Sequence, residues 1–422
     1  MMSKEKRRVP KLRFPGFTED WVQRKLGEIF EYLQNNTLSR DSLNYKNPNI
    51  KDIHYGDILV KFDEILDGSN KDIPYINSEL DLSKFSKSLL QDGDIIFSDT
   101  AEDDTVGKAI ELQNVNAPFI LSGLHTIPCR PLIPFGKGYL GNFLNSYSYR
   151  IQLRPLVQGI KVSSISKSAL KDTMIEYPKN LDEQEKIGCL FQNVAKMITL
   201  HQRKLDNLKL KKKALLQKLF PKNGEQYPEL RFPGFTDVWE QRKLESLFTK
   251  YEDKISTPDS GYWRLGLRSH CKGTFHTYVD AGHELETTEM YRVKAGNFIL
   301  NITFAWERAL AVTDDEDQGK LVSHRFPQFK PNDDLVIDFF KHTLMDKRFK
   351  HHLELSSPGG AGRNKVLKVS DMLKYELLVP SIQEQNIISS FLNNVDYIIT
   401  LHQRKLDHLK LQKKALLQQM FV

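Results

Sequence analysis

The stretch LHQRKLDNLKLKKKALLQKLF, from Leu200 to Phe220, decides the fold because the chain contains it twice. LHQRKLDHLKLQKKALLQQMF runs from Leu401 to Phe421, and the longer segments Ile198–Phe220 and Ile399–Phe421 agree at nineteen of twenty-three positions. Such self-similarity indicates a repeated structural unit. Each copy of this helix therefore marks the end of one repeat.

A second repeat lies upstream of each helix. LRFPGFTEDWVQRKLGEIF (Leu12–Phe30) returns as LRFPGFTDVWEQRKLESLF (Leu230–Phe248), with thirteen of nineteen positions identical. We call these two segments the entry motifs. The stretches between the repeated ends, Thr37–Tyr177 and Lys250–Val379, do not visibly align; we call them the first and second body. Two similar frameworks with different bodies indicate distinct tasks for the bodies, although an old duplication that simply diverged is the alternative.

The repeated helix has the period of a coiled coil. Its apolar residues recur alternately four and three residues apart, which is the spacing of a coiled-coil seam. A lysine occupies the seam in both copies, and a polar seam residue can fix register and partner. We therefore predict that the two helices pair with each other, the alternative being that each packs on its own body. The predicted seam comprises Leu205, Leu208, Lys212 and Leu215 in the first copy and Leu406, Leu409, Lys413 and Leu416 in the second.

Each helix begins after a proline, with Glu and Gln in its first turn. YPKNLDEQEKIGCLF precedes the first helix and VPSIQEQNIISSFL precedes the second. We expect Asp182 and Ser381 to cap the helix starts. Acidic residues in a first turn suit the positive end of the helix dipole.

The bodies carry turn-plus-strand signals and helical segments, which predicts an α+β chain of mixed domains. Late in the bodies, GIKVSSISKSAL (Gly159–Leu170) and GGAGRNKVLKVSDML (Gly359–Leu373) combine glycine, small polar and basic residues before a helical start. Such loops can approach phosphates closely, although each could also be a solvated surface turn. The candidate DNA contacts are Lys161, Ser163 and Ser164 in the first loop, Arg363, Asn364 and Lys365 in the second, and also Arg268, His270, Lys272 and Arg308.

The composition limits the function classes. The formal charge of +7 and pI of about 8.9 mildly favour a polyanionic partner. Neither a P-loop nor a glycine-rich dinucleotide or methyl-donor fingerprint is present, and the stretch HCKGTFHTYVDAGH lacks a standard zinc spacing. We find no apolar run long enough for a membrane span and no secretory signal, so we expect a cytoplasmic protein without a catalytic or metal site of its own.

Taken together, the paired entry motifs, the Pro-then-Glu-Gln helix starts and the repeated helices resemble the specificity subunit of a bacterial type I restriction-modification system. The resemblance covers essentially the whole chain. It implies a pseudo-two-fold internal repeat in which two target recognition domains are joined by two long helices in an antiparallel coiled coil. The implied domains are 1–178, the first helix at 179–222, then 223–379 and the second helix at 380–422.

The resemblance also implies partners. The subunit would recognise double-stranded DNA with a bipartite target and catalyse nothing itself. Two modification subunits would bind S-adenosylmethionine and methylate adenine, and two restriction subunits would use ATP and Mg. The seam of 26 residues, Val194–Leu219, spans about 39 Å at 1.5 Å per residue, close to one B-DNA turn of roughly 34 Å, so the helices would act as spacer and docking surface. The alternative is a stand-alone DNA-binding repressor or architectural protein.

Overall fold

The computed structural model describes residues 8–46, 49–77, 82–116, 119–222, 224–283, 289–359 and 365–422. The chain folds into two compact units, Met1–Lys204 with His402–Val422, and Leu205–Leu401. Each unit therefore contains one body, the first part of one long helix and the last part of the other. Within the described residues, no helix has the length and apolar character that crossing a membrane requires.

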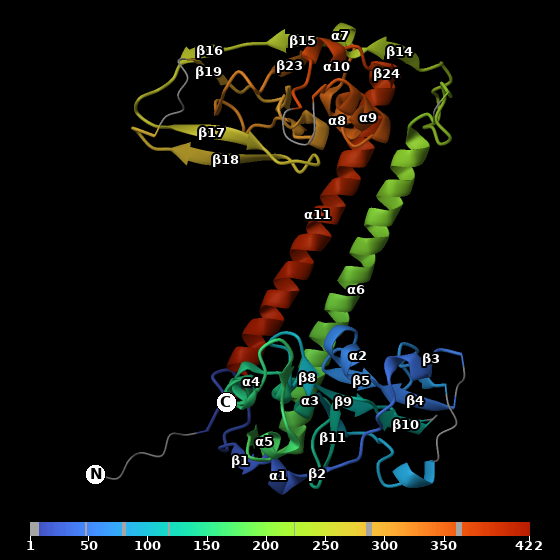
Figure 1. Cartoon of the computed structure of the whole chain (residues 1–422), viewed down its shortest axis with the longest axis vertical. Helices are drawn as coiled ribbons and strands as arrows, with labels where there is room; N and C mark the ends of the chain where they lie inside the picture. Colours follow the sequence, from blue (N-terminus) through green and yellow to red (C-terminus); the bar gives the residue numbers. More distant parts are fainter. Residues whose placement is uncertain are drawn as a thin grey trace. The chain divides into compact units, whose positions relative to one another are not determined.

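The first unit begins with short strands and helices that precede the long helix α6 (Figure 1). Their bounds are β1 Val22–Lys25, α1 Leu26–Ile29, β2 Phe30–Tyr32, η1 Arg40–Ser42, β3 Leu43–Asn44, β4 Ile50–Ile53, α2 Tyr55–Val60, β5 Ile65–Asp67, β6 Tyr75–Ile76, η2 Leu82–Phe85, β7 Ile95–Ser98, β8 Thr100–Ala101, β9 Ala109–Gln113, β10 Phe119–Ser122, β11 Thr126–Pro131, α3 Tyr139–Leu144, α4 Tyr147–Leu153, η3 Arg154–Leu156, β12 Ser163–Ser164, α5 Lys167–Lys171, β13 Met174–Tyr177 and α6 Leu181–Leu219.

Two sheets form the first body. One has the strand order β2-β11-β7-β9-β5 and the other β10-β4-β6-β3, while β1 pairs with β13 and β8 with β12. Strands β4 and β7 are buried along their whole length, as expected of strands covered on both faces. The core of this unit also contains Met420 and Phe421, which follow the end of the second long helix. The last turn of that helix is therefore part of the first unit's core.

The second unit repeats the β-α-β start and the final strand before its long helix, but both of its sheets differ from those of the first unit. Its sheets have the orders β15-β23-β20-β21 and β16-β19-β22-β17-β18, and β14 pairs with β24. The bounds are β14 Glu240–Lys243, α7 Leu244–Leu247, β15 Phe248–Tyr251, β16 Lys254–Ser256, β17 Tyr262–Leu267, β18 Thr274–Val279, β19 Glu289–Arg292, β20 Phe298–Leu300, η4 Ala305–Glu307, β21 Leu310–Val312, β22 Leu321–Val322, β23 Gln328–Pro331, α8 Ile337–Thr343, α9 Lys347–Leu355, α10 Val369–Met372, β24 Glu376–Val379 and α11 Ile382–Gln419.

The helix ends meet the entry motifs in the same way in both units. The amide of Leu12 donates to the carbonyl oxygen of Gln419 at 2.8 Å, and the amide of Leu230 donates to that of Lys218 at 2.8 Å. These bonds join equivalent positions of the repeats. The aromatic residue that follows each helix then packs edge-on against the tryptophan of the entry motif, in the pairs Phe421–Trp21 and Phe220–Trp239, with centroids 6.4 and 6.0 Å apart. Each entry motif is therefore held by the end of a long helix.

The Glu-Gln helix starts have a structural role that the sequence did not reveal. Glu183 is buried and accepts two bonds from the Arg13 guanidinium, at 2.7 and 2.9 Å. In the second unit Glu384 accepts two bonds from Arg231, both at 2.8 Å. This hydrogen bonding raises the pKa of both arginines. The acidic residue of each first turn thus ties a long helix to the arginine of its entry motif.

The glutamine of each start binds the backbone of its own unit. Gln184 donates to the carbonyl oxygen of Pro178 at 2.7 Å and accepts from the amide of Gly136 at 2.8 Å. Gln385 likewise donates to Pro380 at 2.9 Å and accepts from Val336 at 2.9 Å. Because these side chains are buried, their polar groups need partners within the chain.

The predicted cap of the first long helix was wrong. Asn180, not Asp182, caps it, since its Oδ1 accepts from the amides of Asp182 and Glu183 at 2.8 and 3.4 Å. Asp182 instead lies within the first turn, where it pairs with Lys186 at 3.5 Å. The cap predicted for the second helix is present, because Ser381 Oγ accepts from the amide of Glu384 at 3.4 Å.

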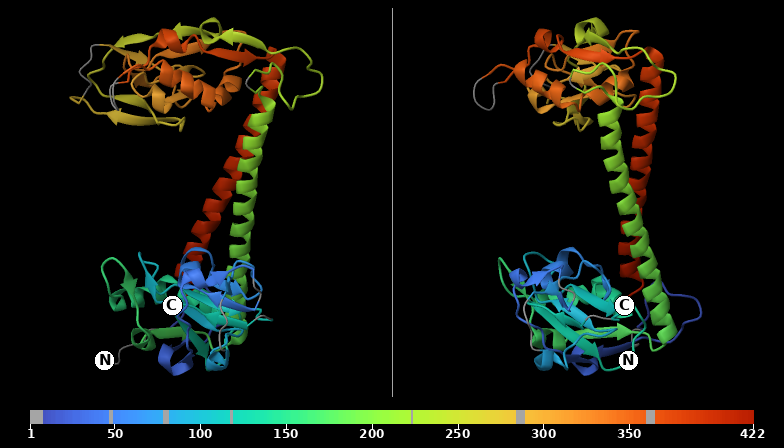
Figure 2. Two further views of the ribbon diagram at one scale, coloured as in Figure 1. Left: turned by 45° about the vertical axis from the view of Figure 1, so that its right-hand side comes forward. Right: turned by 90° about the vertical axis from the view of Figure 1, so that its right-hand side faces the viewer.

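The long helices α6 and α11 are each unbroken (Figure 2), and they pack together with opposite chain directions. In the first unit the contacts Phe191–Phe421 and His201–His402 establish this direction; the two histidine Nδ1 atoms lie 3.1 Å apart. None of the eight predicted seam residues is fully exposed: Leu205, Leu406 and Leu409 are buried, and Leu208, Lys212, Leu215, Lys413 and Leu416 are half-buried. The predicted α+β fold, with two mixed bodies and two packed long helices, is confirmed.

The seam lysines have different partners in the two units. In the second unit Lys212 Nζ contacts Asp396 Oδ1 of the neighbouring helix at 2.5 Å. In the first unit Lys413 Nζ instead contacts both carboxylate oxygens of Glu64, at 2.6 and 2.8 Å, and Glu64 belongs to the body. The equivalent of Asp396 in the first helix copy is Ala195. The body of the first unit therefore supplies the carboxylate that the helix lacks.

Candidate nucleic-acid interface

Two distant segments of the second body meet at the turn between β17 and β18. The amide of His270 donates to the carbonyl oxygen of Glu307 at 2.8 Å, and that of Cys271 donates to that of Arg308 at 2.9 Å. The Ser269 hydroxyl binds the Glu307 carboxylate at 2.8 Å. His270, Cys271 and Arg308 all have positive φ angles. The structure thus brings the candidate residues of the turn next to Arg308, which lies well over thirty residues away in sequence.

The candidate Lys365 lies at the same place. Its ammonium group is 5.2 Å from the ring centre of Trp306, in a cation–π contact. Two residues later, the amide of Leu367 donates to the carbonyl oxygen of Ile302 at 2.8 Å, which fixes this segment beside η4. The other two candidates of the loop, Arg363 and Asn364, lie outside the described residues.

Exposed aromatic side chains accompany these basic groups. Trp263 and Tyr278 are about half exposed and face each other across the β17–β18 ribbon, with centroids 5.3 Å apart. The guanidinium of Arg268 lies 5.3 Å from the ring centre of Phe275, and Phe304 is also exposed. By the strand register, Trp263 and Tyr278 lie on one face of these two strands, and Phe275, opposite Gly266, lies on the other. Aromatic rings beside cations suit nucleic-acid contacts. The Arg268–Phe275 face, which combines a ring with a cation, is therefore the candidate surface.

In the first body, the candidate loop forms a tight hairpin. Ser163 and Ser164 form β12, which pairs with β8, and Gln158 exchanges two backbone bonds with Ser164, at 2.9 and 2.8 Å. Lys161 is exposed at the tip. Gly159 has φ 104°, and a Cβ there would lie 2.0 Å from a carbonyl oxygen of the loop, so glycine is required. The hairpin therefore presents Lys161 on a rigid turn.

Two further residues at equivalent positions escaped the sequence analysis. The amide of Asp99 donates to the carbonyl oxygen of His125 at 3.1 Å, and in the second unit the amide of Ile302 donates to that of Arg325 at 3.0 Å. Both His125 and Arg325 are exposed beside the candidate loops. No glycine turn or period marks them in the sequence, because their position depends on strand pairing.

A basic network on the first body was also missed. The buried carboxylate of Asp57 pairs with Arg40 and, at 2.8 Å, with Lys61. Both cations also donate to the Tyr45 hydroxyl, at 3.3 and 3.1 Å. Hydrogen bonding to Asp57 raises the pKa of both Arg40 and Lys61. The result is a fixed pair of surface cations beside an exposed aromatic ring, although Arg40 and Lys61 lie twenty-one residues apart in sequence.

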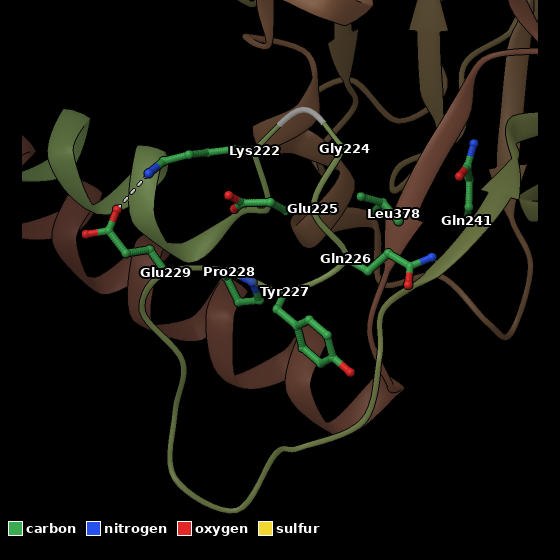
Figure 3. A pocket seen from close by; sticks show the side chains of 9 residues that line it. All are labelled: Lys222, Gly224, Glu225, Gln226, Tyr227, Pro228, Glu229, Gln241 and Leu378. Atoms are coloured by element: carbon green, nitrogen blue, oxygen red, sulfur yellow. Dashed lines mark hydrogen bonds and ion pairs between the residues drawn. The ribbon is translucent and has the colours of Figure 1, made fainter.

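A pocket of about 720 Å³ lies beside the linker that follows α6 (Figure 3). It is lined by Lys222, Gly224, Glu225, Gln226, Tyr227, Pro228, Glu229, Gln241 and Leu378. The Glu229 carboxylate is held by Lys222 at 3.0 Å and by Lys218 at 2.7 Å. Because these charges already pair with each other, we attribute the pocket to the packing of the linker rather than to a nucleic-acid site.

The stretch considered for zinc has another arrangement. His276 Nε2 lies 2.7 Å from Asp317 Oδ1. Across the described part of the chain, no three His, Cys, Asp or Glu side chains are grouped so that they could hold a metal ion.

Comparisons with known proteins agree with this architecture. A family model described as the type I restriction modification DNA specificity domain matches residues 18–210 and again residues 236–411. The MjaX specificity subunit of a type I restriction enzyme from Methanocaldococcus jannaschii is 23% identical over 432 residues, covering 94% of this chain and 92% of that protein. The crystal structure of a type I restriction-modification S subunit from M. genitalium has a similar fold, with a TM-score of 0.53 at 14% identity, covering 98% of this chain and 99% of that one.

Proposed function

Since this chain belongs to the type I restriction-modification DNA specificity family, we propose that each of its two bodies reads one half of a bipartite DNA target. The family match occurs once per repeat, in residues 18–210 and 236–411. As a specificity subunit the chain recognises DNA and is itself non-catalytic. One observation carries the proposal. The two frameworks are equivalent, each held by an Arg–Glu pair, whereas the bodies that they hold have different second sheets.

The candidate contacts divide into two chemical roles. Exposed cations such as Lys161 and Lys272 would bind phosphates and supply salt-dependent affinity. Side chains fixed in the turn and loop region would reach base edges, because base contacts carry the sequence information. The exposed ring of Phe275, beside Arg268, would add apolar contact area next to the bases.

We further propose that two modification subunits dock on the long helices. The helices keep apolar side chains exposed at equivalent positions: Leu200 and Leu411 in the first unit, each 65% exposed, and Leu401 and Leu210 in the second, 44% and 66% exposed. Exposed apolar residues that recur in both repeats suit two copies of one partner. S-adenosylmethionine would bind in those partners, while two restriction subunits would bring ATP and Mg, and the assembly would act on DNA in the cytoplasm.

The competing function is a stand-alone repressor or architectural protein. Such a protein would bind its DNA without partners, and its helices would need no repeated apolar surface. Co-expression with the modification subunit distinguishes the two, since a specificity subunit co-elutes with it and a repressor does not.

The test of the proposal is a body exchange. We would replace Thr37–Tyr177 with the corresponding body of a related protein and map methylated adenines in cells that also express the modification subunit. One half of the target should change, while the other half and the unread gap stay the same, because the exchanged segment ends before Glu183 and the long helices. A change in both halves, or in the gap, would contradict the proposal.

A further inference from the structure

Arg308 is held in a conformation that arginine rarely adopts. Its φ is 59°, in the left-handed region that favours glycine. It ends η4, where its amide donates to the carbonyl oxygen of Ala305 at 2.8 Å and its carbonyl oxygen accepts from Cys271 at 2.9 Å. Such conformations persist where the surroundings determine them, and they cluster at functional sites. The backbone of Arg308 is therefore positioned by two separate segments of the second body.

The side chain of Arg308 is not used by the fold. Its Nε is buried without a hydrogen-bond partner, and no ion pair joins its guanidinium to a carboxylate in the part of the chain that the structure describes. The adjacent carboxylate, Glu307, is bound by Ser269 instead. By contrast, Arg13 and Arg231 each make two bonds to a glutamate. The buried Nε cannot itself meet a ligand, so the groups that this turn offers to a partner outside the chain are the terminal Nη atoms, which make no hydrogen bond within the described residues.

The surroundings indicate which partner. Arg268, Lys272 and Arg325 are exposed nearby and can hold the phosphate backbone, while Arg308 is half-buried among them. A guanidinium is a planar fork of donors that matches the O6 and N7 acceptors of guanine in the major groove. A planar fork on a fixed backbone suits a base edge better than a phosphate, which a lysine can bind equally well.

We propose that Arg308 is a specificity-determining residue of the second body and reads a guanine through its O6 and N7 atoms. This inference rests on the proposed function, and it adds the identity of one reader and the base it selects. Lys365, stacked on Trp306 beside the same turn, would position the strand through a phosphate.

The test compares Arg308→Lys with Lys272→Ala in complexes with the modification subunit. Arg308→Lys keeps the charge and loses the fork, so mapped methylation should show a roughly ten- to hundredfold loss of preference for guanine at one position of one half-site. The other half-site and the gap should be unchanged. Lys272→Ala is the matched control: it should weaken binding to all sequences and lower the salt slope by about 0.9, as loss of one phosphate contact does.

A folding control separates reading from structure. Arg308→Gly fits the positive φ without steric cost, so its thermal melting should match the wild type while the same guanine preference is lost. Unchanged preference in both Arg308 variants, or uniform weakening with a lower salt slope, would overturn the assignment of Arg308 as a base reader. A wild-type complex that methylates no bipartite target would instead refute the proposed function itself.

Discussion

The connection between β7 and β9 in the first unit and the connection between β20 and β21 in the second occupy equivalent positions but differ in charge: the first is acidic, and the second is formally neutral. The first contains Asp99, Glu102, Asp103 and Asp104, and its one cation, Lys108, points inward to the carbonyl oxygen of Phe62 at 2.8 Å. The second contains Trp306, Glu307 and Arg308, with Lys365 alongside. Carboxylates accept from the amino group of cytosine, whereas guanidinium groups donate to guanine.

The frameworks show the opposite behaviour. The Arg–Glu pairs, the backbone bonds from Leu12 and Leu230 and the edge-on tryptophan contacts recur with nearly equal distances. The difference teaches that the chain separates the residues that set the geometry from the residues that meet the ligand. Variation in the loops leaves the Arg–Glu pairs and the tryptophan contacts unchanged, because no loop residue takes part in these shared contacts.

The largest expected effect tests the equality of the frameworks. Glu183→Ala and Glu384→Ala each leave a largely buried arginine unpaired, which should lower the free energy of unfolding by about 3–5 kcal/mol in the unit affected. Because the two sites match, the two losses should agree within about 1 kcal/mol, as measured by urea denaturation. Asp172→Ala, which removes an exposed ion pair with Lys25, is the control and should leave the free energy of unfolding nearly unchanged, because solvent screens this pair. Clearly unequal losses would show that the frameworks are not equivalent.

The second prediction uses pH to separate the units. Burial raises the pKa of Asp52 in the first body from 3.8 to about 7. The folded state therefore keeps a proton that the unfolded state releases. The free energy of unfolding should fall as the pH rises from about 4 to about 7, by up to about 1.4 kcal/mol per pH unit. Asp52→Asn should remove this decline in pH-dependent denaturation.

In the second body the sign is reversed. Burial lowers the pKa of His342 from 6.5 to about 4. The unfolded state then binds the extra proton, so stability is fully present above pH 6.5 and should be lost as the pH falls towards 4. The two windows overlap between about pH 4 and pH 6.5, where the two groups give slopes of opposite sign. Asp52→Asn should therefore leave a stability that rises with pH in this range, and His342→Gln should leave one that falls. If either variant left the slope unchanged, the group it replaces would not control the pH dependence.

The smallest expected effect concerns the loops. Lys272→Ala should lower the slope of log binding constant against log salt by about 0.9, the contribution of one phosphate contact. Lys161→Ala should lower it by less, because the paired strand β8 leads into the exposed carboxylates Glu102, Asp103 and Asp104, which repel phosphate. Equal slopes would show that the acidic connection of the first body does not face the DNA backbone.

Sequence alone predicted the framework well, because repetition exposes it. The long helices, their pairing and the burial of Leu205 and Leu406 follow from a four-and-three spacing that any packed helix pair must satisfy. The predicted cap, Asp182, lies two residues after the actual cap, Asn180, because Asn180 stands outside the periodic segment. The role of Glu183 was hidden because its partner, Arg13, lies 170 residues away.

The candidate interface could be predicted only in pieces. Lys161 and Lys365 lie in glycine-rich loops with a recognisable composition. Their neighbours His125 and Arg325 have no local signal, since strand pairing alone brings them to the loops. The Asp57 network was missed for the same reason: Arg40 in η1 reaches Asp57 of α2 and nears Lys61 only once β3 and β4 have folded. Long-range packing, which periodicity does not encode, assembles these groups.

The bond from Leu12 to Gln419 has a consequence for how such chains evolve. In the second unit, a linker of nine residues joins Phe220 to Leu230, whose amide bonds to Lys218. In the first unit the equivalent residues, Phe421 and Leu12, are far apart in sequence, and the bond between Leu12 and Gln419 holds them together. The framework is topologically a ring that can be cut at either of two equivalent joints. Recombination at these joints can therefore exchange target halves while keeping the Arg–Glu pairs and the tryptophan contacts that both units share, whereas a contact supplied by one body, such as Glu64 to Lys413, changes with that body.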